Sequence, residues 1–255
     1  MNGKDWMQLP VTKTNMILDD TVNQELASFL TKKNEEERRS HSGKLMASML
    51  GMPTLWQILS SISIPDKPFD AYTLAKFKRG QDVEKEMLPF VKGTIATQKE
   101  IIVGHAKGYA DAIIDTQQYA VKCGVIPLEI KSVTNAKFRR ILKEGAQKGH
   151  LLQGGFYALG EKSTHFGLLY VASDDYRTLL MIEELAKVKE EITSEMQAYE
   201  KAITSKMIPV FDPKEKWHTK EEYMKYIDWC TLSEDQIMQK LQSEFPTHYQ
   251  FFMSL

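Results

Sequence analysis

The spacing of apolar residues divides the chain into a helical first part and a strand-rich middle. In the first part, apolar residues recur at the three- and four-residue intervals that place them on one face of a helix. After Gly93, apolar and β-branched residues come in short runs separated by turn residues, which is typical of strands. The helices are expected at 19–33, 43–50, 53–62 and 70–91, with Ser42 as a cap, and the strands at 94–104, 107–115 and 125–133.

After the third strand, the pattern predicts a helical segment, two further strands and a last helix. One helical segment is predicted over 135–161, although its glycines weaken a helix. Two strands at 164–172 and 177–184 follow, and then an amphipathic helix at 185–206. This order predicts an α/β fold with a mixed central sheet flanked by helices. The expected parts of one compact domain are a helical region 1–92, a core 93–206 and an extension 207–255, where Trp217, Tyr223, Tyr226 and Trp229 either pack the tail or offer a base-stacking surface.

Composition narrows the class of protein further. The 255 residues carry a net charge of -1, so any binding of a polyanion must come from local basic patches or a bound metal. Two cysteines, Cys123 and Cys230, cannot form a disulfide framework or a four-thiolate site. The N-terminus lacks the apolar core of a signal peptide, and no apolar run has the length of a membrane span. A cytoplasmic protein without membrane contact is expected.

The strand at 125–133 places an acid and a base on the same face. Because side chains alternate along a strand, Glu129 and Lys131 point the same way. The preceding strand carries Asp111 and Asp115, so one of these carboxylates can meet Glu129 across the sheet. A Glu-x-Lys sequence alone also occurs by chance, as a surface ion pair. Asp111 is favoured over Asp115 as the partner because of its position along the strand.

Two carboxylates beside a lysine suit a particular chemistry. Hard oxygen ligands favour Mg²⁺ or Mn²⁺, which keep waters and take phosphate oxygens as further ligands. A lysine next to such an ion can orient or help to deprotonate an attacking water, and it can offset charge that develops on a phosphate. The pattern therefore predicts a metal site for phosphoryl chemistry.

Four short motifs in order resemble the PD-(D/E)xK nuclease superfamily. Gly108 precedes Asp111, and Glu129 and Lys131 follow after an interval of eighteen residues. Downstream, Gln153 and Tyr157 match the Gln-x-x-x-Tyr motif of the RecB-like and lambda-exonuclease-like branch. Upstream, Gly80 and Glu84 are similar to the helix-borne glycine and acid of those families. The resemblance covers about residues 76–185 and implies a restriction-endonuclease-like core.

The resemblance also implies roles for these residues. Asp111, Glu129 and the backbone carbonyl of Ile130 would bind the metal, and Lys131 would act on the attacking water. Glu84 would bind the metal directly or through a water, or else be an ordinary solvated helix residue. Gln153 and Tyr157 would hold the nucleic-acid backbone or steady the site, although Tyr157 could equally be a packing residue.

Basic residues gather around the same motifs. Each of them could contact phosphate, although a run of charges is more commonly a solvated helix face. The residues expected to bind DNA are Lys78, Arg79, Lys107, Ser132, Lys137, Arg139, Arg140 and Lys148.

The resemblance implies a Mg²⁺- or Mn²⁺-dependent DNA exonuclease in recombination or repair of phage or prophage type, working beside a single-strand annealing protein. Two alternatives stay open, an endonuclease on the same fold and a catalytically silent DNA-binding module. An iron–sulfur cluster, which some relatives bind through four cysteines, is not expected with two. The chain has no nucleotide-binding Gly-x-x-x-x-Gly-Lys-Ser/Thr loop. A homo-oligomer is compatible with the sequence, but no interface pattern predicts one.

Overall fold

A long hairpin forms the first part of the sheet. β2 (Thr94–Val103) and β3 (Ala106–Asp115) pair antiparallel from Val103–Ala106 to Thr94–Ile114. Gly104 in the connecting turn has φ +55°, a left-handed conformation that glycine adopts without steric cost. The two strands predicted before and after this glycine are confirmed.

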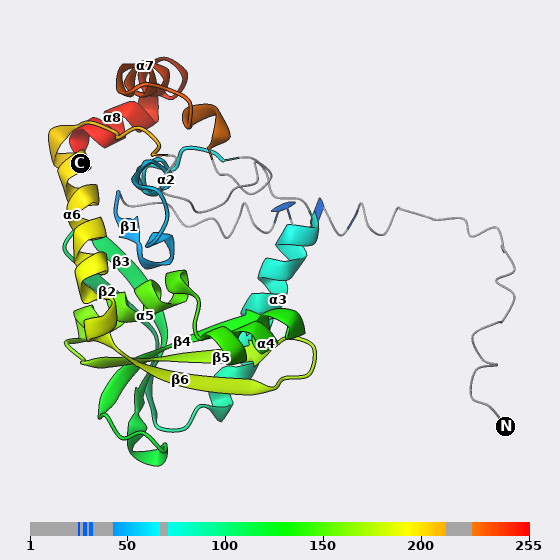
Figure 1. The fold of residues 1–255 in the computed structure, drawn as a ribbon. Coiled ribbons are helices and arrows are strands. Elements are labelled where there is room, and N and C mark those ends of the chain that lie inside the picture. The colour runs from blue at the N-terminus through cyan, green and yellow to red at the C-terminus, as the bar shows by residue number, and fades with distance from the viewer. Residues whose placement is uncertain (1–24, 26–27, 30, 33–42, 67–70, 213–225) are drawn as a thin grey trace, which may run out of the picture.

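The remaining strands in the described part of the chain complete a mixed, six-stranded sheet (Figure 1). β3 pairs antiparallel with β4 (Val125–Val133), β4 pairs parallel with β5 (His165–Ala172), and β5 pairs antiparallel with β6 (Thr178–Glu184). β1 (Leu45–Met46) pairs parallel with β3 and begins the strand order β1-β3-β4-β5-β6. β2 lies off this order and pairs with β3. The predicted α/β class with a mixed central sheet flanked by helices is confirmed, and it agrees with a restriction-endonuclease-like core.

The parallel pairing of β4 and β5 needs a crossover connection, and helices supply it. The crossover consists of α4 (Asn135–Glu144) and α5 (Lys148–Glu161). The prediction of one helical segment over 135–161 is wrong, because the chain turns at Gly145 with φ +89°. Glycine adopts this positive φ without steric cost, so the chain leaves α4 there and begins α5 at Lys148.

Helices cover both faces of the sheet. α3 (Ala71–Met87) places Val83 against even-numbered residues of β4, such as Leu128 and Ile130. On the other face, α5 and α6 (Lys189–Ser205) pack Phe156 and Ile192 into the larger core cluster with Tyr170. Each strand of the sheet centre is therefore buried on two sides, which explains why its residues are almost continuously apolar.

The segment before α2 differs from its prediction. A helix was expected over 43–50, but Leu45 and Met46 form β1 and residues Ala47–Met49 form the short 3-10 helix η2. Leu45 donates its N–H to the His105 carbonyl (2.9 Å), so pairing with β3 replaces helical hydrogen bonds there. The helix predicted over 53–62 is confirmed as α2 (Thr54–Ser61).

The C-terminal region folds into helices that lie near α2 and the end of α6 (Figure 1). α7 (Glu234–Glu244) begins at a capping box formed by Ser233, and α8 (Pro246–Ser254) follows it. Tyr226 and Trp229 are buried, so these two aromatic residues pack the tail onto the domain. The other short 3-10 helices among the described residues are η3 (Leu88–Phe90), η4 (Thr116–Gln118), η5 (Leu185–Lys187) and η7 (Ile227–Trp229).

This computed structural model describes residues 43–66, 71–212 and 226–255, together with residues 25, 28, 29, 31 and 32. Most of the helix predicted over 19–33 lies outside the described residues, as do the predicted cap Ser42 and the aromatic residues Trp217 and Tyr223. Within the described ranges, no helix is both long enough and apolar enough to cross a membrane.

Candidate active site

The end of the β3–β4 pairing brings two acids together. The paired residues run from Asp115–Val125 to Ala112–Leu128, and the next residues along are Asp111 and Glu129. There the Asp111 carboxylate accepts the backbone N–H of Ile130 through Oδ2 (2.7 Å). The acid thus continues the hydrogen bonding of the strand at the point where the backbones part. Both carboxylates are buried, with exposed fractions of 6 % and 4 %.

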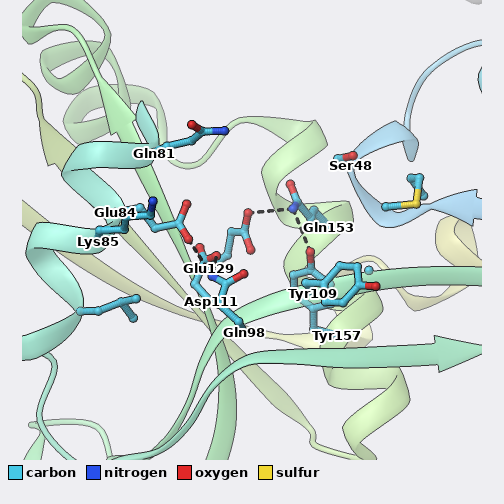
Figure 2. A pocket seen from close by; sticks show the side chains of 13 residues that line it. Ser48, Gln81, Glu84, Lys85, Gln98, Tyr109, Asp111, Glu129, Gln153 and Tyr157 are labelled. Carbon is cyan, nitrogen blue, oxygen red and sulfur yellow. Dashed lines mark hydrogen bonds between the residues drawn. The ribbon is translucent and has the colours of Figure 1, made fainter. Parts of the chain in front are cut away.

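A third acid comes from α3. Figure 2 shows the carboxylates of Glu84, Asp111 and Glu129 pointing toward one another. α3 is fixed on this side of the sheet because Arg79 donates to the Ser173 carbonyl in the β5–β6 turn, and the Tyr176 hydroxyl donates to Glu86. The helix therefore presents Glu84 to the sheet rather than to solvent alone.

The carboxylate of Glu129 is bonded on one side only. Its Oε1 accepts from Lys131 Nζ (2.5 Å) and from Gln153 Nε2 (2.7 Å). Its Oε2 is buried and has no hydrogen-bond partner among the described residues. A buried carboxylate oxygen without a partner is costly, so this atom is suited to a cation.

Gln153 and Tyr157 form a chain behind Glu129. Both lie on one face of α5, and Gln153 Nε2 donates to the Tyr157 hydroxyl (2.9 Å) as well as to Glu129. Tyr157 lies against Gly108, where an added Cβ would stand 2.7 Å from its ring. The glycine of the first motif thus makes room for the tyrosine of the last one.

Burial and the closeness of like charges raise the pKa values of the two buried acids in this cluster. Burial first, and then the neighbouring Glu129 and Glu84 carboxylates, raise the pKa of Asp111 to about 9. Burial also raises the pKa of Glu129, while the Lys131 ammonium lowers it. The pKa of Tyr157 is raised by burial and then by Glu129, so its hydroxyl keeps its proton. Without a cation, the cluster disfavours its fully ionised state.

The acids line a cavity of about 630 Å³ between α3, the β2–β3 hairpin and α5. Sequence reasoning missed several residues of its lining, of which Gln98 on β2 is the most closely engaged. Its Nε2 donates to Glu84 Oε1 (2.7 Å) and to Asp111 Oδ1 (3.2 Å). Nothing in the sequence pattern marks Gln98. Also unpredicted in the lining are Met46, Ser48, Gln81, Lys85, Leu88 and Tyr109.

Three other candidate residues, Asp115, Ile130 and Ser132, make no side-chain hydrogen bond to the acid cluster within the described part of the chain. Asp115 accepts from the Gln117 N–H (3.1 Å) at the far end of β3, so it caps a turn. Ile130 and Ser132 are strand residues of β4 that pair with Leu169 and Val171 of β5. The predicted roles of the Ile130 carbonyl and of Ser132 remain predictions.

The basic residues separate into paired and open groups. Lys78 contacts Asp82, Arg140 contacts Glu144 (2.6 Å), Lys148 contacts Glu191 (2.5 Å), and Arg79 lies 3.5 Å from Asp174. Lys137 and Arg139 are exposed on α4, and Lys107 is half-buried on β3. Lys137, Arg140 and Lys148 border a second cavity, of about 450 Å³, between α4 and α5.

The steric role of Gly108 gives a first prediction. Gly108→Ala is expected to destabilise the protein by about 1 to 3 kcal/mol, because the new methyl group meets Ala47 and Tyr157 at 2.6 and 2.7 Å. Displacement of Tyr157 also disturbs Gln153 and Glu129. Denaturant unfolding measures the effect. Gly80→Ala on α3 is the matched control: it has no neighbouring atom within 4 Å and is expected to stabilise its helix. Equal stability of the two variants would contradict the steric role.

Comparisons with known proteins give distant structural matches. No protein-family model matches the chain, and no curated protein matches it. The crystal structure of SSO0001 aligns with a TM-score of 0.42 and 16% identity over 70% of this chain and 86% of that one. An alkaline exonuclease, LHK-Exo from Laribacter hongkongensis, aligns with a TM-score of 0.42 and 13% identity over 71% of this chain and 95% of that one. The same exonuclease in complex with dAMP gives 0.41 and 13% over the same shares. These similarities are too low to place the chain in a family.

Proposed function

We propose that this protein is a Mg²⁺- or Mn²⁺-dependent deoxyribonuclease that hydrolyses phosphodiester bonds, acting from DNA ends. One observation carries the proposal: Glu84, Asp111 and Glu129 converge in a cavity beside the ammonium of Lys131. The preference for ends rests on the order of the sequence motifs, which resembles that of lambda-exonuclease-like enzymes.

The residues present fit a divalent ion. The bare Oε2 of Glu129, Oδ1 of Asp111 and the Glu84 carboxylate are the hard oxygen donors that Mg²⁺ and Mn²⁺ prefer. Within the described residues, no three such side chains stand close enough to hold an ion as they are, so small movements of these carboxylates would accompany loading. When bound, the ion would supply Lewis acidity and lower the pKa of a water.

Residues of the protein would orient the metal ligands, act on the attacking water and contact the DNA phosphates. Lys131 and Gln153 both hold Oε1 of Glu129, which keeps its other oxygen free for the ion. The Lys131 side chain is 24% exposed, so its ammonium can donate to a phosphate oxygen or to the oxygen of an attacking water while bonded to Glu129. Tyr157 fixes Gln153 from behind. The exposed Lys137 and Arg139 on α4 are suited to phosphates of the bound strand.

The direct test uses end-labelled linear DNA and closed circular DNA with Mg²⁺, Mn²⁺ or a chelator. Linear DNA is expected to be degraded to short products only with the metal, and circular DNA is expected to survive. Glu129→Gln, which keeps the shape of the side chain but removes its charge, serves as the inactive control. Cleavage of the circle would indicate an endonuclease instead. Binding of DNA without metal-dependent cleavage would indicate a silent binding module and reject the enzymatic proposal.

A further inference from the structure

Gln98 has a backbone conformation that its position in a strand does not explain. β2 pairs Thr97 with Ala112 and Lys99 with Ala110, so Gln98 lies opposite Asp111. Its φ is +50°, in the left-handed region that non-glycine residues enter only at a steric cost. Such conformations persist where surrounding contacts hold them, and they cluster at functional sites.

The contacts of the Gln98 side chain point to that function. The amide Nε2 donates to Oε1 of Glu84, at 2.7 Å, and to Oδ1 of Asp111, at 3.2 Å. The other oxygen of Asp111 is already taken by the Ile130 N–H. The amide therefore covers the Asp111 oxygen that is left for a metal ion, and it bridges an acid of α3 to an acid of β3 (Figure 2).

An amide N–H and a metal ion compete for the same carboxylate oxygens, because both need their lone pairs. Gln98 is also an exposed residue, so its side chain can swing into solvent without opening the core. We propose that Gln98 is a positioning residue that stands in for the divalent ion in the metal-free protein and is displaced when the ion binds. This inference rests on the proposed metal-dependent function.

The stand-in has two consequences with opposite signs. In the metal-free protein, the amide joins Glu84 to Asp111 by two hydrogen bonds and keeps Glu84 at the site, so it stabilises the fold. On metal binding, its hydrogen bonds to both carboxylates are lost, so it weakens the ion's net affinity. Loss of the amide should therefore lower stability in chelator and tighten metal binding.

Calorimetric titration with Mn²⁺ and thermal unfolding in chelator test this on the full chain. Gln98→Ala is expected to bind Mn²⁺ about three- to tenfold more tightly than the unmodified protein, the amount set by the net strength of an ordinary hydrogen bond. Its unfolding midpoint in chelator is expected to fall by about 2 to 4 °C. Gln98→Glu has the same shape but no donor. Its unfolding midpoint in chelator is expected to fall further, and Mn²⁺ is expected to raise that midpoint more. Gln81→Ala is the matched control, because Gln81 lines the same cavity from α3 with its amide turned away from the acids (Figure 2).

The outcomes separate this inference from the proposed function. If the unmodified protein binds Mn²⁺ and Gln98→Ala binds it equally or more weakly, the stand-in role is overturned and the metal site survives. If Gln98→Glu unfolds in chelator at the same temperature as the unmodified protein, the bridging role in the metal-free state is overturned. If the unmodified protein binds neither Mn²⁺ nor Mg²⁺, the proposed function fails and this inference fails with it.

Discussion

Asp111→Asn is expected to abolish metal-dependent DNA hydrolysis and, at the same time, to stabilise the metal-free protein. Asp111 is buried beside Glu129 and Glu84, and these surroundings raise its pKa to about 9. Asparagine has the same shape without the charge, and its side-chain oxygen can still accept the Ile130 N–H. The variant therefore removes a metal ligand together with an electrostatic penalty.

The stability gain has a defined pH dependence. The folded-state pKa of Asp111 lies above its unfolded value of 3.8, so between about pH 4 and 9 the folded protein holds a proton that the unfolded chain has lost. The stabilising contribution is complete below pH 3.8 and is lost as the pH rises through 9. The free energy of unfolding in chelator should fall by up to about 1.4 kcal/mol per pH unit within this window.

Denaturant unfolding in chelator at several pH values measures this effect. Asp111→Asn should flatten the curve, leaving the dependence that comes from Glu129, whose pKa is raised by burial while Lys131 lowers it. Asp115→Asn is the control on the same strand, since Asp115 only caps a turn through the Gln117 N–H. Parallel pH curves for the unmodified protein and Asp111→Asn would show that Asp111 is not held in its neutral form.

Lys131→Met is expected to slow DNA hydrolysis by about 100- to 10,000-fold, the range of a positioned acid or base. The variant keeps the aliphatic stem and removes the ammonium that lies 2.5 Å from Glu129 Oε1. Single-turnover cleavage of labelled DNA at saturating protein measures the chemical step, and binding of DNA in the absence of cleavage should change little. Nearly unchanged cleavage would exclude Lys131 from the reaction.

The same variant tests the ion pair by its stability. Lys131→Met leaves Glu129 buried without its cation, so a destabilisation of about 1 to 3 kcal/mol at neutral pH is expected in chelator. Adding Glu129→Gln should restore most of this loss, because no buried charge then lacks a partner. Lys187 and Glu183 are the matched pair, joined at 2.7 Å but exposed at the lysine, and there the same cycle should give a small coupling. Equal coupling in both pairs would mean that burial does not strengthen the Glu129–Lys131 pair.

Gly108 and Tyr157 show what the sequence motifs contain and what only the packing of the fold reveals. Both residues are recognisable in the sequence as parts of motifs, 49 positions apart by their numbers. Their reason for being together appears only in the fold, where the missing Cβ of one leaves space for the ring of the other. Gly80 belongs to a motif in the same way, yet open space surrounds it, so no steric requirement explains its glycine.

The basic residues show the limit of reasoning from charge alone. Lys78, Arg79, Arg140 and Lys148 were predicted to bind DNA because they surround the motifs. Their long side chains reach acidic partners within the chain, and Arg79 fixes α3 to the β5–β6 turn. Their contact with DNA stays a prediction. Which acid a flexible basic side chain meets depends on contacts between distant segments, and a linear pattern does not contain them.

The sequence by itself determined the α/β class, the order of the central strands and helices, and the placement of Glu129 and Lys131 on one face. These follow from local rules, since alternation and helical spacing depend only on neighbouring positions. Tertiary structure alone decided that α3 delivers Glu84 to Asp111, that β1 replaces a predicted helix, and that Gln98 bridges two acids in a left-handed conformation. Each of these depends on a hydrogen-bond partner or a packed neighbour far away in the chain, so the energy that fixes it exists only once the sheet and its helices have come together.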